Sequence, residues 1–236
     1  MSNYTVHYKS RKDNFHGYMV DGATFARPFD IPIMQPCHVI PKELISFSEA
    51  MRTSRDMSNA FVHFYEHDEK IERFWNNPRK YMSKLRSFAG VIAPDYSLCR
   101  DFPESLKIWN TYRNYACGYW LQSQGLAVIA NIRLSGKNSE SYALAGAPRN
   151  SVIAIGAHGN IRFPDNQDYF FTDVAKAVNT LHPTAIIVYG TDSYGMFEYP
   201  RALGIPIHFF KNHRYAELER TARNDEAAEQ RFQVIA

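Results

Sequence analysis

The sequence predicts a single α/β domain built on a parallel sheet, and it favours a (β/α) barrel of about seven to eight strands. Short apolar runs alternate about seven times with segments of helical spacing. Runs with little polar alternation are typical of parallel strands that are covered on both faces. Most of them end in polar residues, which would then gather at one edge of the sheet. An open doubly wound sheet fits the same alternation, but no glycine-rich dinucleotide fingerprint follows any strand.

The composition is that of an ordinary soluble globular protein. The 236 residues are 45% hydrophobic and 22% charged, and a chain of this length buries a large core without disulfides. Its three cysteines lie far apart and show no metal-binding spacing. The net charge of +3 permits a phosphorylated small molecule as partner but does not indicate a nucleic-acid groove. We expect a cytoplasmic protein without a membrane partner, since neither a signal peptide nor a long apolar segment is present.

We divide the chain into an N-terminal arm (residues 1–30), a core domain (31–214) and a C-terminal helix or tail (215–236). The arm lacks clear periodicity and carries a small basic cluster, Lys9, Arg11 and Lys12. Such a cluster is more typical of a solvated surface than of a nucleic-acid contact. No linker or internal repeat divides the core.

The core elements follow from the spacing of the apolar residues. Ile31–Met34 is the expected first strand, and Leu44, Phe47 and Met51 predict a helix after it. Further strands are predicted at 60–65, 90–93, 126–132, 151–156, 184–190 and 205–210. Helices are predicted at 71–86, 104–122, around 171–181 and at 196–203. Asn77-Pro78 interrupts the first of these, because proline breaks the helical hydrogen-bond pattern.

Polar side chains follow most of the predicted strands. They are Glu66 after the second, Asp95 after the third, Asn131 and Arg133 at the fourth, His158 after the fifth, and Tyr189 and Asp192 at the sixth. The carboxyl ends of parallel strands meet at one edge, so we expect these residues around a single mouth. Arg100 belongs to a polar loop just above that mouth.

These residue types suit acid–base chemistry on a polar or phosphorylated molecule. Arg133 would hold an anion bidentately, and His158 would transfer a proton. Asp95 or Asp192 would orient that histidine or act as the base. Asn131, Tyr189, Glu66 and Arg100 would contribute to binding.

Each of these residues also has a purely structural interpretation. Asp95 fits a turn or helix cap as well as it fits catalysis. His158 would serve equally well in a hydrogen bond to the backbone. Arg133 could pair with Asp95 across neighbouring strands for stability alone, and the composition around Asp192 is that of a turn.

The sequence identifies no cofactor and predicts no metal site. His63 and His67 lie on an extended segment, not at the helical i, i+4 spacing of a zinc-binding H-E-x-x-H motif. The sequence leaves open whether the protein is an enzyme, on which substrate it acts and what its oligomeric state is.

Four segments carry a resemblance to a known family. They read PDYSLCRDFPESLKIWNTYRNYACGYWLQSQG, IANIR, NSVIAIGAHGNI and AIIVYGTD, and together they cover most of Phe88 to Phe210. The chain thereby resembles a family of phages, prophages and bacterial mobile elements that is catalogued as a domain of unknown function. The resemblance implies a protein of viral or mobile-element origin in the bacterial cytoplasm. It implies no activity.

Two functions from different classes fit these observations. One is an enzyme or ligand-binding barrel that acts on a nucleotide-like or other phosphorylated small molecule. The other is a noncatalytic phage accessory protein that contacts a host protein or nucleic acid. The first requires the polar side chains in one concave pocket, whereas the second leaves them dispersed or paired off.

Overall fold

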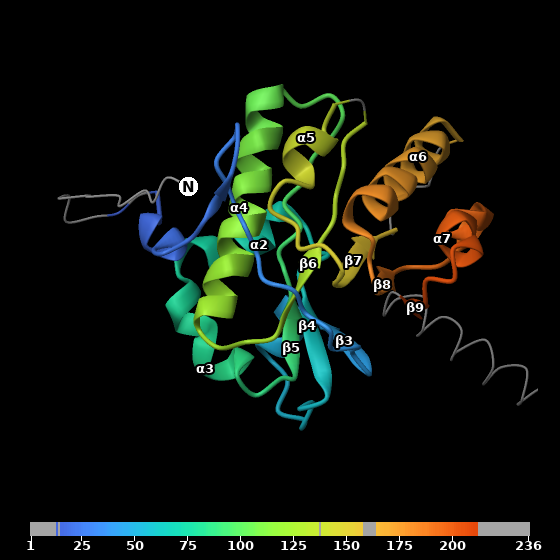
Figure 1. Cartoon of the computed structure of the whole chain (residues 1–236). Helices are drawn as coiled ribbons and strands as arrows, with labels where there is room; N and C mark the ends of the chain where they lie inside the picture. The colour runs from blue at the N-terminus through green and yellow to red at the C-terminus, as the bar shows by residue number, and fades with distance from the viewer. Residues whose placement is uncertain (1–12, 14, 137, 158–163, 212–236) are drawn as a thin grey trace, which may run out of the picture.

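A seven-stranded parallel sheet forms the framework of the protein (Figure 1). The computed structural model describes residues 13, 15–136, 138–157 and 164–211. The strands, which pair in the order of the chain, are β3 (Glu43–Ser46), β4 (Ala60–His63), β5 (Gly90–Ile92), β6 (Val128–Asn131), β7 (Val152–Gly156), β8 (Ala185–Tyr189) and β9 (Ile207–Phe210). All six pairings are parallel. The predicted α/β fold with a parallel, barrel-like sheet is confirmed.

The side chains on the two faces of the sheet form separate cores, because successive strand residues point to opposite faces. One core includes Val62, Val91 and Ile186 and packs against helical residues such as Ile71 and Trp120. The other is built on Phe61, Ile92, Ile129, Val152 and Ile187. Leu44 of β3 and Phe210 of β9 both pack against this second core, although they come from opposite ends of the sheet. The sheet is therefore curled around it and nearly closed into a barrel.

Helices connect the strands as crossovers. They are α1 (Phe47–Ala50), α2 (Asp68–Asn76), α3 (Met82–Leu85), α4 (Glu104–Ser123), α5 (Glu140–Ala143), α6 (Pro164–Leu181) and α7 (Glu198–Ala202). Short 3-10 turns lie at η1 (Gly17–Val20), η2 (Pro78–Tyr81) and η3 (Ser193–Gly195). The expected break at Asn77-Pro78 separates α2 from η2. Figure 1 shows α6 and α7 beside β8 and β9, apart from α4. None of the helices in the described part of the chain could span a membrane.

The prediction for the start of the sheet is wrong in two respects. Within Ile31–Met34 only Ile31–Pro32 is a strand (β2), and it pairs antiparallel with β1 (Phe25–Ala26) outside the large sheet. The segment predicted as a helix instead begins with β3, and only the four residues of α1 are helical. The helix prediction rests on Leu44 and Phe47, which are three residues apart, as on one face of a helix. In the structure Leu44 lies on the short edge strand β3 and Phe47 begins α1, so the same spacing crosses the end of a strand.

The described part of the N-terminal segment packs on the core. Met19, Val20 and Ala23 are buried in the same cluster as the helical residues, and the His16 ring lies against Trp75 with 4.8 Å between centroids. The predicted basic cluster and the predicted C-terminal tail lie outside the described residues.

Candidate functional site

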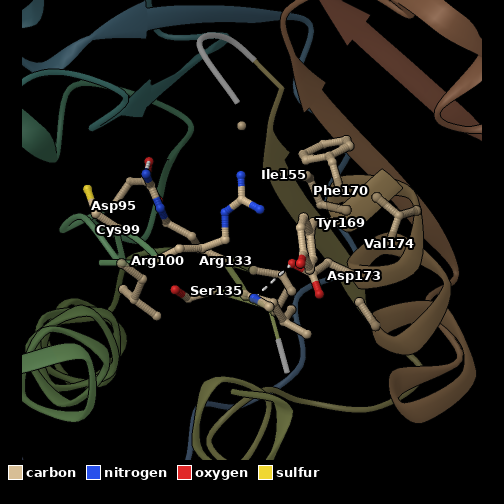
Figure 2. Close-up of a pocket in the computed structure, with 16 residues that line it drawn as sticks. Asp95, Cys99, Arg100, Arg133, Ser135, Ile155, Tyr169, Phe170, Asp173 and Val174 are labelled. Atoms are coloured by element: carbon tan, nitrogen blue, oxygen red, sulfur yellow. Dashed lines mark hydrogen bonds and ion pairs between the residues drawn. The ribbon is translucent and has the colours of Figure 1, made fainter. Parts of the chain in front are cut away.

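A cavity of about 240 Å³ lies at the C-terminal ends of β6 and β7. Four segments line it: the loop from Asp95 to Arg100, the segment from Ile132 to Gly136, the end of β7 at Ile155 and Gly156, and the face of α6 from Tyr169 to Ala177. Figure 2 shows Arg133 in the middle, with Asp95, Cys99 and Arg100 on one side of it and Tyr169, Phe170 and Asp173 on the other. Three of the predicted site residues therefore contribute to one concave site.

Asp95 is the centre of a buried hydrogen-bond network. Arg133 Nη1 donates to its Oδ2 over 2.6 Å, and Asn131 Nδ2 donates to its Oδ1 over 2.7 Å. Tyr65 in turn donates its hydroxyl to Asn131 Oδ1 over 3.0 Å. The Asp95 and Arg133 side chains are only 11% and 21% exposed. The cross-strand pairing that the sequence allowed is thus present, and it is extended by an amide and a phenol.

Burial and pairing act in opposite directions on the pKa values of the two groups. Burial raises the pKa of Asp95, while the Arg133 charge and the bonds from Asn131 and Arg133 oppose that rise. Burial alone would lower the pKa of Arg133, but the Asp95 charge overcompensates, and its pKa is raised. Removing either partner would leave the other buried without a counter-charge.

Two guanidinium groups present free donors to the cavity. Among the described residues only Nη1 of Arg133 has a hydrogen-bond acceptor, so Nε and Nη2 are unpaired. The exposed Arg100 guanidinium has no acceptor in that part of the chain and lies 4.2 Å above the centre of the Tyr169 ring. Arginine presents its donors as a planar fork that matches the oxygens of a carboxylate or phosphate. This side of the cavity can therefore hold an anion.

The wall formed by Ser135, Gly136 and Asp173 carries polar groups whose hydrogen bonding is incomplete. Asp173 Oδ2 accepts a long bond of 3.4 Å from the Gly136 amide. Ser135 Oγ is buried and has no partner among the described residues. Gly136 has φ of +81°, a conformation that favours glycine and brings its amide toward α6. The cavity therefore combines a cationic side with an acceptor side.

Asp173 is the acidic group of the cavity whose ionisation changes near neutral pH. Burial raises its pKa to about 6, against the opposing effects of the Gly136 N–H, Lys176 and Arg100. Glu140 adds to the rise. A carboxyl group in this range can exchange a proton with a ligand at physiological pH.

An aromatic stack fills the top of the barrel next to the network. The Tyr65 and Tyr189 rings are parallel, with 4.9 Å between centroids, and His63 lies 4.3 Å from Tyr189. Burial lowers the pKa of His63 to about 3, so the imidazole is neutral, and its Nδ1 accepts the Tyr65 N–H. Gly156 makes room for this stack, because a Cβ there would lie 2.8 Å from the Tyr65 ring.

The remaining predicted site residues lie elsewhere. Tyr189 belongs to the aromatic stack and does not line the cavity. Asp192, in the loop after β8, pairs with Arg201 of α7. Glu66 accepts the Ser48 N–H over 2.9 Å and lies 3.8 Å from Lys70. His158 lies outside the described residues.

Sequence reasoning missed four residues of this region. Tyr65 alternates with Phe61 and His63, so the period of two could have placed it on the inner face. Tyr169 lies in the part of α6 that precedes the predicted helix, since α6 begins seven residues earlier, whereas Asp173 falls inside the predicted helix without a signal that marks it as a site residue. Ser135 was assigned to a loop, and no sequence signal distinguishes it from its neighbours. Within the described ranges, no three His, Cys, Asp or Glu side chains could hold a metal ion together.

The comparison with protein families decides the affiliation of the chain. Residues 23–205 match the family described as "Domain of unknown function (DUF4417)". The chain belongs to this family. The matched range contains the whole cavity and all strands except β9, so the site lies in the shared domain. The resemblance noted from the sequence is confirmed.

Two curated relatives come from bacterial viruses. The chain is 25% identical over 167 residues to the Gene 1 protein of Mycobacterium phage D29, which covers 70% of the chain and 62% of that relative. It is also 25% identical over 165 residues to the Gene 1 protein of Mycobacterium phage L5, with 69% and 71% covered. The match thus spans less than two thirds of the first relative. No solved structure matches the chain significantly. The protein is phage-related.

Proposed function

We propose that the cavity binds a small phosphorylated ligand of nucleotide-like chemistry. The observation that carries this proposal is the set of N–H donors on Arg133 and Arg100 that have no acceptor among the described residues and line the same cavity. Forked donors of this kind bind phosphate oxygens bidentately. The position at the carboxyl ends of parallel strands, where such folds place their ligands, also supports it.

The rest of the cavity suits the non-phosphate part of such a ligand. Tyr169 is 42% exposed; the Arg100 guanidinium covers one face of its ring, and the rest of the ring offers an aromatic surface for a planar base. Asp173 lies one helical turn after Tyr169 and supplies a hydrogen-bond acceptor. In this arrangement Asp95 holds Arg133 in place instead of acting as the base. Asp192 pairs with Arg201 outside the cavity lining, so of the predicted catalytic residues His158 remains the candidate for chemistry on the bound ligand.

The likeness to mycobacteriophage proteins supports a cellular context for this function. We infer that the protein is encoded by a phage, prophage or mobile element and acts in the cytoplasm of the bacterial host. A phosphorylated metabolite of that host is then the ligand.

Isothermal titration calorimetry on the full chain tests the proposal. Nucleoside 5′-monophosphates should bind, whereas the corresponding unphosphorylated nucleosides should bind at least about tenfold more weakly. Arg100→Gln should weaken binding of the monophosphates at least about tenfold, because it removes the exposed guanidinium without leaving a buried charge. The matched control is Arg86→Gln, which removes an exposed arginine that follows α3 and precedes β5, at the other end of the strands.

Two results would contradict the proposal. Equal weakening by Arg100→Gln and Arg86→Gln would reveal a general effect of net charge instead of a site. Absence of binding by any phosphorylated compound would favour the alternative, a noncatalytic accessory protein that contacts a host protein or nucleic acid.

A further inference from the structure

The acceptor side of the cavity is under-satisfied in a specific way. Asp173 makes one long hydrogen bond, to Gly136, and no ion pair with another described residue. The nearby Lys176 donates to Glu140 over 3.0 Å instead. A partly buried carboxylate with so few donors is costly unless a further donor reaches it.

A second acceptor next to Asp173 is also without a partner. Ser135 is 7% exposed, lines the cavity, and its Oγ has no hydrogen-bond partner among the described residues. Ser135 immediately precedes Gly136, whose amide donates to Asp173. One wall of the cavity therefore carries two polar side chains from different elements, a buried serine hydroxyl and a carboxylate that accepts a single long bond, and a ligand that brings N–H groups would supply donors to the carboxylate.

The neighbouring aromatic ring adds a geometric constraint. Tyr169 and Asp173 are four residues apart on α6, so they lie on the same face of the helix. Figure 2 shows both side chains on the same side of Arg133. Since the Arg100 guanidinium covers one face of the Tyr169 ring at 4.2 Å, a flat ring in the cavity would lie against the remaining face or edge of Tyr169, beside the carboxyl group.

We propose that Asp173 is a specificity-determining residue that recognises a ring edge with two adjacent N–H donors, the edge that guanine presents, with Ser135 supporting it. This inference rests on the proposed function and names the class of base. An ionised carboxylate has two oxygens and can accept both donors at once. Hypoxanthine lacks the exocyclic amino donor, and adenine places a ring acceptor beside its amino group.

Recognition of this edge depends on pH. The carboxylate form accepts both donors, and burial places the pKa of Asp173 at about 6. The charged groups that act on it are Lys176, Glu140 and Arg100, while Cys99 and the Asp95–Arg133 pair line the same cavity. The preference for the two-donor edge should therefore decline as the pH falls through about 6.

Calorimetry on the full chain with guanosine, inosine and adenosine 5′-monophosphates at pH 8 tests the inference. Guanosine monophosphate should bind at least about tenfold more tightly than the other two, as expected for a bidentate pair. Asp173→Asn should remove this preference, because an amide has one acceptor oxygen beside a donor NH2 group and cannot face two adjacent N–H donors bidentately. Asp168→Asn, an exposed carboxylate of the same helix that does not line the cavity, should retain it.

The outcomes separate this inference from the proposed function. Equal binding of the three nucleotides by the unaltered protein would overturn the inference and leave the phosphate site standing, and it requires no variant to fold. A preference that persists in Asp173→Asn would overturn the role of Asp173. Absence of binding by all three would reject the proposed function itself. Ser135→Ala should weaken guanosine monophosphate binding without reversing the order of the three.

Discussion

Asp95 and Asp192 each follow a strand of the barrel and each pair with an arginine, yet their surroundings differ. Asp95 has both oxygens occupied, and its partners continue through Asn131 to Tyr65. Asp192 uses one oxygen on Arg201, whose side chain is 47% exposed, and its other oxygen is buried with no partner among the described residues. A carboxylate at a strand end is therefore insufficient evidence for a site. The groups that surround it decide whether it organises a cavity.

The largest expected effect comes from breaking the networked pair. Arg133→Gln should lower the free energy of unfolding at pH 8 by about 3–5 kcal/mol, because it leaves Asp95 buried without its counter-charge. The loss should shrink as the pH falls, since protonation neutralises Asp95. Urea denaturation at several pH values measures it.

The matched variant at the other pair is Arg201→Gln. It should cost about 1 kcal/mol or less, because a half-exposed arginine on the short helix α7 is screened by water. Equal losses in the two variants would show that the networks around the two pairs do not matter for stability.

Gly156→Ala tests the close packing of Gly156 against the Tyr65 ring, a contact of the Asp95 network and not of the Asp192–Arg201 pair. The added methyl group would lie 2.8 Å from the Tyr65 ring, and overpacking of this kind costs about 1–3 kcal/mol. Combining it with Tyr65→Leu, which shortens the opposing side chain, should recover part of that loss. Thermal denaturation of the two variants compares them, and a double variant that is no more stable than additivity predicts would exclude the contact as the cause.

Asp173 provides a third carboxylate, one without an arginine partner. Burial holds its pKa at about 6 in the folded protein, above its ordinary value of 3.8. A raised pKa means that stability is present at low pH and is lost as the pH rises through about 6. Asp173→Asn should therefore stabilise the protein by about 1–2 kcal/mol at pH 8 and have little effect at pH 3.5. Asp168→Asn should show no such dependence when urea denaturation is followed at both pH values.

Tyr65→Phe has the smallest expected effect among the changes to the Asp95 network. It removes only the hydroxyl that donates to Asn131 and keeps the ring stacked on Tyr189. One hydrogen bond of this kind contributes about 1 kcal/mol. A double-mutant cycle with Asn131→Ala, measured by denaturation, should give a coupling energy of that size. A coupling near zero would remove Tyr65 from the network.

The sequence predicted most of the sheet because buried parallel strands are short apolar runs, as at Ala60–His63 and Ala185–Tyr189. The prediction failed at Glu43–Ser46. Only Ile45 of this edge strand is buried, and the spacing of Leu44 and Phe47 resembles that of a helix. For the site, it placed Asp95 and Arg133 correctly at the sheet edge. It missed Asp173 because a carboxylate inside a helix has no local signal, and its environment depends on how α6 packs against β6 and β7.

The order of the strands has a consequence for how the chain folds. Paired residues are separated by 17 positions between Glu43 and Ala60 and by 37 between Val91 and Val128. The entropy of closing a loop grows only slowly with its length, by about 0.6 kcal/mol per doubling, so each new strand pairs at a similar entropic cost. The sheet can therefore grow by successive addition of neighbouring units. Pairing between chain neighbours keeps these separations shorter than in parallel sheets that join distant strands, and shorter separations favour faster folding.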